Sequence, residues 1–525
     1  MIRAMTILVM WLTCSHTFAN PVFHRGNLAE PQSLDPQKFS MVVENQILFD
    51  LFLGLLTYDA FGRPAPGLAE SWTISPDEKV YTFKLRPNLT WSDGKPITAD
   101  DAVFGLQRAV DPATQGWFGN FLSIIKGADD ITAGKAKPDT LGVRAVDPGT
   151  VEIALTKPAP VILKLLAGWS MTYPVPKHAV VANPQGWARA GVMVSSGPYT
   201  LMSWRVSDKI VLTKNARFHD AANIAVPEVH YYPTTDDTAA LNRFRAGELD
   251  FNPRFPPNQI DWLRRNLPRE TKTTPAQAIT YLVFNLKRKP FDDIRVRRAL
   301  ALAIDRQIIT DKILRNGEQP YCGMVPSTIE SYRPACNIDN RPIDQRRAEA
   351  RQLLQAAGFG PNAPLNLELA QRQGQTSRLM SIAVAGMWSE IGVETDIQQS
   401  EVAVHYNNLR EGNFSVADAG WFGSPDPFFF TYLLKAGSTE SNYGAYVSAP
   451  YEAQVVRAEA TMNPSARYEA FRQAEAIALG DVPVVPLFIP VHRTLIKPYV
   501  KGIEVNATGY YVSRYTRIEQ AVGAN

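Results

Sequence analysis

Strand and helix patterns alternate between residues 281 and 397, and this alternation constrains the fold more than any other feature of the chain. Short runs that read as strands fall at 281–285, 365–370 and 393–397. Stretches with helical spacing lie at 296–304, 306–314, 342–357 and 378–391. The last helix stands between two strands, and a β-α-β order of this kind predicts an α/β lobe.

The first half of the chain carries a second set of elements. An alternating strand at residues 80–86 is followed by the turn Trp91-Ser92-Asp93-Gly94 and by a helix that Thr98 caps. Two further strands between residues 143 and 155 form a hairpin around Asp147-Pro148-Gly149. Since 525 residues exceed what one hydrophobic core usually serves, we expect two or three lobes.

Residues 1–19 have the parts of an export signal. Arg3 supplies a positive start, the apolar run at 5–12 is too short to cross a bilayer, and Thr17-Phe18-Ala19 fits a cleavage site. Cys14 raises the question of a lipid anchor, but the residues before it lack the small side chain expected next to a lipidated cysteine. We therefore expect a soluble exported protein that begins near Asn20.

The net charge and the cysteine content indicate which partners and which covalent links to expect. The net charge is +3 with Lys and Arg scattered, so no nucleic-acid partner is indicated. After cleavage only Cys322 and Cys336 remain, and in an exported chain such a pair most simply forms one disulfide. The alternatives are two free thiols, a redox pair or a metal pair. The absence of C-x-x-C and of nearby histidine argues against the last two.

No catalytic or cofactor motif occurs in the sequence. We find no G-x-x-x-x-G-K, no G-x-S-x-G and no H-E-x-x-H, and the seven histidines are dispersed. Paired acids such as Asp100-Asp101 and Asp292-Asp293 stand where helices begin, so capping and the helix dipole account for them. We therefore expect no enzyme, metal site or cofactor. An exported hydrolase, such as a glycosidase with an unmarked carboxylate pair, is a distant alternative.

Residues 417–427 form an unusual stretch. A strand-like run at 414–417 leads into small residues around Trp421, then into two prolines and Asp426. Glycines on both sides of Trp421 allow a close approach of backbone to another chain or to a ligand. Two interpretations stay open at this point. The stretch is a buried turn with a core tryptophan, or it is the wall of a pocket.

Several further motifs follow one another along nearly the whole chain. The most specific block contains Pro66-Gly67-Leu68-Ala69-Glu70-Ser71-Trp72, residues 81–86 and Trp91-Ser92-Asp93-Gly94-Lys95-Pro96. Others are Glu30-Pro31-Gln32-Ser33-Leu34-Asp35-Pro36, Gly197-Pro198-Tyr199, Gly247-Glu248-Leu249-Asp250, residues 291–297 and Ala303-Ile304-Asp305-Arg306. Together they resemble the oligopeptide- and dipeptide-binding proteins of ABC importers, family five of the extracytoplasmic solute-binding proteins.

The resemblance implies an α/β fold of the periplasmic-binding-protein type (type II, cluster C), with two lobes that enclose the ligand and an extra inserted domain. The expected divisions are residues 20–52, 179–271 and 490–525 for lobe I, 53–178 for the inserted domain, and 272–489 for lobe II. It also implies a periplasmic monomer that captures peptides or peptide-like solutes. The partners are the transmembrane permease subunits of an ABC transporter with cytoplasmic ATPases.

The same resemblance implies which residues meet the ligand. The strand Gly420-Trp421-Phe422, followed by Gly423, is expected beside the ligand backbone, and Ser40-Met41-Val42 faces it from the other lobe. Further expected contacts are Trp117, Phe118, Asn285, Tyr443 and Tyr446. For Trp117 and Phe118 the alternative is a surface loop anchored by apolar contacts.

The sequence departs from the family at two places. A carboxylate three residues after the Trp usually pairs with the ligand's α-amine, and Ser424 stands there instead. Asp426 is the candidate substitute; otherwise the ligand lacks a free amine, as a modified peptide, peptide conjugate, opine or sugar does. Arginines expected just before the strand are replaced by Leu409 and Asp418, so Asp418 either adds negative charge to the site or forms a structural pair. A nickel-complex binder is conceivable within the family, but no histidine cluster supports it.

Overall fold

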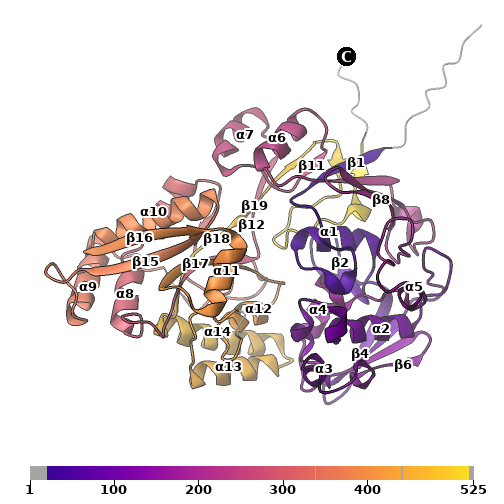
Figure 1. Ribbon diagram of the computed structural model, residues 1–525, viewed down its shortest axis with the longest axis horizontal. Coiled ribbons are helices and arrows are strands. Elements are labelled where there is room, and N and C mark those ends of the chain that lie inside the picture. The colour runs from indigo at the N-terminus through magenta and orange to yellow at the C-terminus, as the bar shows by residue number, and fades with distance from the viewer. Residues whose placement is uncertain (1–20, 337, 439–440, 520–525) are drawn as a thin grey trace, which may run out of the picture.

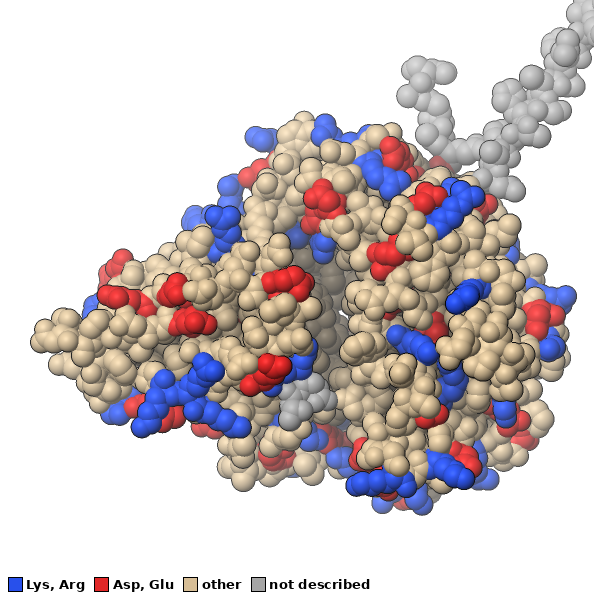
Figure 2. Space-filling view, in the orientation of Figure 1, with Lys and Arg blue, Asp and Glu red and all other residues tan. Residues whose placement is uncertain are grey.

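The protein, described here by a computed structural model over residues 21–336, 338–438 and 441–519, consists of two bodies (Figure 1). The space-filling view shows a hollow between them (Figure 2). Mixed sheets and helices make up both bodies, which confirms the expected α/β class. The predicted signal at residues 1–19, including Cys14, lies outside the described residues.

The first body is built on a seven-stranded sheet in the order β12-β19-β11-β1-β10-β9-β8. Within it, β1 (Val22–Asn27) pairs in parallel with β10 (Glu228–Pro233). The other strands are β8 (Tyr199–Arg205), β9 (Lys209–Lys214), β11 (Phe251–Asn252), β12 (Thr271–Pro275) and β19 (Val491–Ile496). Helices α1 (Val42–Leu51), α6 (Asp237–Arg245) and α7 (Ile260–Asn266) belong to this body (Figure 1). Strands from the start, middle and end of the chain therefore share one sheet.

A four-stranded antiparallel sheet extends the first body, in the order β4-β5-β7-β6. Its strands are β4 (Ala69–Ile74), β5 (Val80–Leu85), β6 (Val143–Asp147) and β7 (Thr150–Ala154). Around it lie the hairpin strands β2 (Leu56–Tyr58) and β3 (Pro64–Pro66) and helices α2 (Ala99–Val110), α3 (Ala128–Thr132), α4 (Val161–Gly168) and α5 (Lys177–Ala182). As expected from the capping pattern, α2 begins directly after Thr98, whose N–H donates to the Asp101 carboxylate at 3.0 Å.

The second body is built on a six-stranded sheet in the order β14-β18-β13-β17-β15-β16. These strands are β13 (Ala278–Phe284), β14 (Gln319–Pro320), β15 (Leu365–Arg372), β16 (Val393–Ser400), β17 (Val416–Phe422) and β18 (Val484–Ile489). Its helices are α8 (Ile294–Leu302), α9 (Ile343–Ala356), α10 (Gln375–Ser389), α11 (Val402–Glu411), α12 (Phe428–Thr431), α13 (Ala449–Glu459) and α14 (Pro464–Asp481). Buried residues of α8, α9 and α10 pack with those of β13 and β15 in one apolar core.

The chain passes between the two sheets at two short crossings. Residues 276–277 connect β12 to β13, and Pro490 alone connects β18 to β19. The crossings lie together, because the N–H of Ala276 donates to the carbonyl of Pro490 at 2.8 Å. The expected lobe boundary at residue 272 falls inside β12, so the change of sheet comes four residues later. The strands β20 (Val500–Lys501) and β21 (Arg517–Ile518) then close the chain.

Three local predictions have clear outcomes. The disulfide between Cys322 and Cys336 is confirmed, with Cα atoms 5.9 Å apart. The helix expected at 306–314 is a π-helix over Ile308–Leu314, a distinction that apolar spacing does not reveal. The strand expected to end at residue 417 continues to Phe422, so Gly420 and Trp421 belong to the strand itself.

Candidate functional site

One edge of β17 is left without a strand partner. On one side β17 pairs with β13 over its whole length, from Val416 to Phe422. On the other side it pairs with β15 only at Val416 and Ala417. From Asp418 onward the second edge is therefore open to groups other than a strand. Because bonding directions alternate along a strand, Asp418, Gly420 and Phe422 direct their backbone groups toward this edge.

Side chains already meet part of the open edge. His405 is bonded to the Asp418 carbonyl at 2.8 Å. The hydroxyl of Tyr406 accepts the Gly420 N–H and donates to the Gly420 carbonyl, both at 3.3 Å. Phe422, two residues on, has a 62% exposed side chain. Backbone groups at Phe422 are thus the place where an extended ligand can pair with this edge.

Trp421 is the second notable feature of the strand. Its side chain is partly buried against the main apolar core. The indole Nε1 is buried and finds no hydrogen-bond partner among the described residues. An unsatisfied buried donor costs roughly 1–3 kcal/mol. A ligand oxygen placed at Nε1 would recover that loss, which favours the pocket-wall interpretation over a plain core tryptophan.

Asp418 is fully buried and lies in a polar cluster. Its carboxylate accepts the Arg372 N–H at 2.8 Å and the Ser377 hydroxyl at 2.5 Å. The Arg372 Nε lies 3.3 Å away as an ion pair, and His405 Nε2 lies 3.5 Å away. The arrangement favours the structural pair that the sequence left open, since four groups already surround the carboxylate.

Arg372 is a site residue that the sequence did not single out. It is the last residue of β15, and its Nη1 donates to the Tyr406 hydroxyl at 2.6 Å. A Cβ added at Gly420 would lie only 2.8 Å from Nη1 and 3.0 Å from Nη2. The missing side chain at Gly420 therefore lets the guanidinium lie against the strand. Burial alone would lower the pKa of Arg372, but Tyr406 and Asp418 raise this pKa above its ordinary value.

Ser424 is buried and is bonded to the other body. The indole Nε1–H of Trp169 donates to its hydroxyl at 2.9 Å. Next to it, the Lys164 amine donates to the Pro425 carbonyl at 2.9 Å. Burial lowers the pKa of Lys164, and the nearby Asp426 opposes this shift. The place where the family resemblance puts a carboxylate thus holds a hydroxyl, an indole donor and an amine.

Asp426 forms a two-pronged ion pair with Arg467. Its two oxygens accept from the guanidinium at 2.7 and 2.8 Å, and both side chains are 4% exposed. The same carboxylate accepts the N–H of Phe428, the first residue of α12, at 2.9 Å. With these partners in place, the geometry favours a structural role for Asp426 over the expected role as a partner for a ligand amine.

Glu44 binds the backbone of the segment 40–42 through hydrogen bonds. This fully buried carboxylate accepts the backbone N–H groups of Gln32, Ser33, Ser40 and Met41, at 2.6–3.2 Å. Val42, at the start of α1, is 51% exposed. Glu44 therefore fixes the backbone of the loop that is expected to face the ligand. The sequence did not predict this role.

Aromatic rings join the two bodies beside Ser424. Phe118 lies 5.0 Å from Phe39 and 5.2 Å from Trp169, measured between ring centroids. Trp169 in turn stacks on Phe429 of the second body at 5.9 Å, and Phe121 lies 6.3 Å from Phe429. We call Phe39, Phe118, Phe121, Trp169 and Phe429 the aromatic cluster. Trp117, by contrast, is 68% exposed.

Three other expected contacts have partners within the protein. The Asn285 side chain, 4% exposed, donates to the carbonyls of Gly412 and Phe414 and accepts the Lys287 N–H. Tyr446 is also buried and donates to Asp481 at 2.6 Å. Tyr443 is partly buried, with its ring 6.2 Å from that of Tyr406. Asn285 and Tyr446 thus have the contacts of structural residues.

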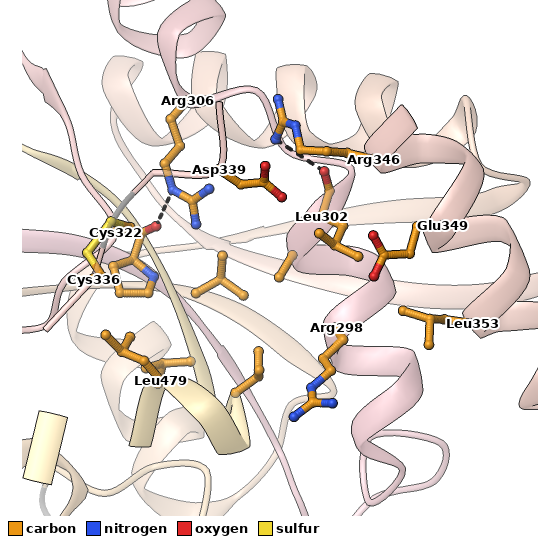
Figure 3. Close-up of a pocket in the computed structure, with 15 residues that line it drawn as sticks. Arg298, Leu302, Arg306, Cys322, Cys336, Asp339, Arg346, Glu349, Leu353 and Leu479 are labelled. Carbon is orange, nitrogen blue, oxygen red and sulfur yellow. Dashed lines mark hydrogen bonds between the residues drawn. A yellow bond between two sulfur atoms is a disulfide. The ribbon is translucent and has the colours of Figure 1, made fainter. Parts of the chain in front are cut away.

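A cavity of about 480 Å³ lies elsewhere in the second body (Figure 3). The disulfide lines it, as do three arginines that donate to backbone carbonyls: Arg306 to Tyr321 and Pro486, Arg346 to Leu302 and Ile304, and Arg298 to Gly480. None of the expected ligand contacts borders this cavity. Its arginines hold chain segments together, and we assign it no ligand.

Membrane-spanning helices and metal-ligand clusters are both absent from the described residues. In the described ranges no helix has the length and apolarity needed to cross a membrane. Within those same ranges no group of three or more histidine, cysteine or acidic residues is placed to hold a metal ion. On the face in Figure 2, basic and acidic side chains are interspersed.

Comparison with known proteins links this architecture to one family. The model for bacterial extracellular solute-binding proteins, family 5 (middle), matches residues 63–442. Escherichia coli periplasmic murein peptide-binding protein MppA is 35% identical, covering 91% of this chain and 89% of its own length. The probable deoxycholate-binding periplasmic protein YgiS of E. coli is also 35% identical, covering 94% and 92%. The crystal structure of Haemophilus influenzae OppA in complex with RPPGFSPFR superposes with a TM-score of 0.82 at 31% identity, covering 95% and 99%.

Proposed function

The chain belongs to family 5 of the bacterial extracellular solute-binding proteins, and we propose that it captures peptides or peptide-like solutes for an ABC transporter. Capture takes place in the periplasm by closure of the two bodies, and the closed complex delivers its cargo to the transmembrane permease subunits. Two relatives support this proposal, because their names describe them as periplasmic proteins that bind peptides.

The open edge of β17 is the observation that carries the proposal. Strand-like pairing with a peptide gives affinity through the main chain, so it tolerates many side-chain sequences. Phe422 supplies backbone groups at this edge, and Trp421 supplies an unsatisfied donor beside it. Both lie in the second body, whose Phe429 stacks on Trp169 of the first body in the aromatic cluster.

Closure is supported by the paired crossings. In the described part of the chain, residues 276–277 and Pro490 are the connections between the two large sheets, and the Ala276 N–H is bonded to the Pro490 carbonyl. A pair of adjacent short connections is the usual construction of a hinge, in which a few residues absorb the backbone change. The bonds of Trp169 to Ser424 and of Lys164 to Pro425 lie across the opening that such a hinge controls.

A ligand without a free amine is the second candidate, and the surroundings of Ser424 favour it. Lys164 and Arg467 place two cations near this position, while Asp426 supplies one carboxylate that Arg467 already binds. Among the described residues an ammonium group would find no free anionic partner here, and losing such a partner weakens binding by roughly 2–5 kcal/mol. The name of YgiS, a relative described as a probable binder of the amine-free acid deoxycholate, also supports this candidate.

Two peptide libraries separate the candidates. The purified protein is incubated with tripeptides that have free α-amines and with the same tripeptides after N-acetylation, and bound masses are read by native mass spectrometry. Retention of the free-amine set supports ordinary peptide capture. Retention of the acetylated set alone supports the amine-free candidate. Binding of neither set, together with no thermal shift, contradicts the proposed function.

A further inference from the structure

We propose that Arg372 recognises an anionic group of the bound solute, a carboxylate in the simplest case, at the open edge of β17. This inference rests on the proposed function and specifies the chemistry of one end of the solute. It assigns to β15 a role in recognition that no motif in the sequence marks.

The position of Arg372 is the first argument. Strands β15 and β17 part after Ala370 and Ala417, and Arg372 is the last residue of β15. Its guanidinium lies against Gly420, where an added Cβ would come within 2.8 Å of Nη1. The cation therefore stands where the strand partner of β17 is missing, two residues before Phe422, whose backbone an extended solute would pair with.

The bonding of the guanidinium is the second argument. Nε is paired with Asp418 and Nη1 donates to Tyr406, which fixes the plane of the fork. Nη2 donates no hydrogen bond to any residue that the structure describes, and the side chain is 22% exposed. Arg372 thus keeps one donor group for a partner from outside, on a side chain that is already oriented.

Asp418 serves to hold Arg372 and leaves it able to accept a second anion. Its carboxylate is fully buried and also accepts the Ser377 hydroxyl and the Arg372 backbone N–H. Those bonds spread its charge over several donors. A planar guanidinium offers five N–H donors, so it can bind one carboxylate at Nε and another at Nη2.

The surroundings of Ser424 and those of Arg372 together indicate which chemical groups the solute carries. At Ser424 the described residues bring two cations, Lys164 and Arg467, and the nearby carboxylate of Asp426 is already bound by Arg467. At Arg372, the Nη2 group can donate a hydrogen bond to an anionic group of the solute. The solute class that fits both is one with a carboxylate and without a free amine, such as an N-acylated peptide with a free carboxyl end.

The experiment uses N-acetylated tripeptides prepared as free acids and as carboxamides, with affinities measured by calorimetry. The wild type should bind acids at least about tenfold more tightly than amides, because hydrogen bonds to charged groups are stronger than those between neutral groups. Arg372→Gln should reduce this acid-to-amide ratio to near one. Arg372→Lys keeps the charge without the fork and should restore part of the ratio. Arg378→Gln, which removes an exposed arginine of α10, is the matched control and should leave the ratio unchanged.

Each outcome decides a different point. An unchanged ratio in Arg372→Gln overturns the inference, as does a wild-type ratio near one. If the wild type binds neither acids nor amides, nor any free-amine peptide, the proposed function itself fails. Should Arg372→Gln not fold because Asp418 is left unpaired, the double variant Arg372→Gln/Asp418→Asn removes that buried charge and allows the same comparison.

Discussion

The indole of Trp169 donates a hydrogen bond to the hydroxyl of Ser424 across the opening between the two bodies, at 2.9 Å. Ser424 comes from the β17 side and Trp169 from the segment after α4. The bond makes position 424 a contact between the two bodies. Under the proposed function the same position also lines the ligand space, and its residue type should then affect both ligand choice and closure.

Ser424→Asp should give the protein affinity for peptides with a free α-amine. A carboxylate at this position can accept from Trp169 and also pair with an ammonium group. We expect a gain of at least about tenfold for free-amine over N-acetylated tripeptides, because desolvated charge pairs are worth roughly 2–5 kcal/mol. Calorimetry with both peptide sets measures the gain. Ser389→Asp, on the exposed end of α10, should change neither affinity, and equal effects of the two variants would contradict the role of position 424.

Asp426→Asn should destabilise the fold instead of merely weakening ligand binding. The substitution leaves the buried guanidinium of Arg467 without its anionic partner. Breaking one side of a buried ion pair typically lowers the unfolding free energy by about 3–5 kcal/mol. Urea unfolding of the ligand-free protein measures this change. A variant of unchanged stability that loses affinity for amines would instead identify Asp426 as a ligand residue.

Glu44→Gln should loosen the loop that contains Ser40 and Met41. The amide replaces one acceptor oxygen with a donor, which leaves some of the four backbone N–H groups unbonded. We expect a loss of at least about 2 kcal/mol in unfolding free energy, because unsatisfied buried donors are costly. Hydrogen exchange at Ser40 and Met41 should accelerate. Glu70→Gln on exposed β4 is the control, and equal exchange in both variants would contradict the role of Glu44.

His492 should make the region of the crossings sensitive to acid. Burial lowers its pKa below the ordinary value of 6.5. As the pH falls below 6.5, the unfolded chain takes up a proton before the folded chain does, so stability decreases until the folded-state pKa is passed. His492→Gln keeps a donor for the Ala507 carbonyl and does not titrate. Between pH 7 and 5 the wild type should therefore lose more stability than the variant, and parallel curves would contradict this prediction.

The sequence predicted the helices and strands better than it predicted which side chains bind one another. The strands expected at 365–370 and 393–397 are β15 and β16, because strongly patterned segments report their own periodicity. The π-helix at Ile308–Leu314 was expected as an ordinary helix, since apolar spacing hardly distinguishes the two.

The site was harder to predict, because its bonds connect distant residues. Trp169 lies 255 residues from Ser424, Arg372 lies 46 from Asp418, and Arg467 lies 41 from Asp426. Only the fold brings these pairs together. The resemblance to the family predicted the strand at Gly420 and the unusual Ser424. No motif in the sequence marks Trp169 or Arg372, the side chains that contact them.

Native mass spectrometry of the protein, purified from the cells that produce it without any unfolding step, tests the central claim most directly. The account predicts a bound small molecule that is released on denaturation and displaced by added peptide or peptide-like solute. Protein that is repeatedly recovered empty, and that binds no member of the free-amine or acetylated peptide sets, would contradict it.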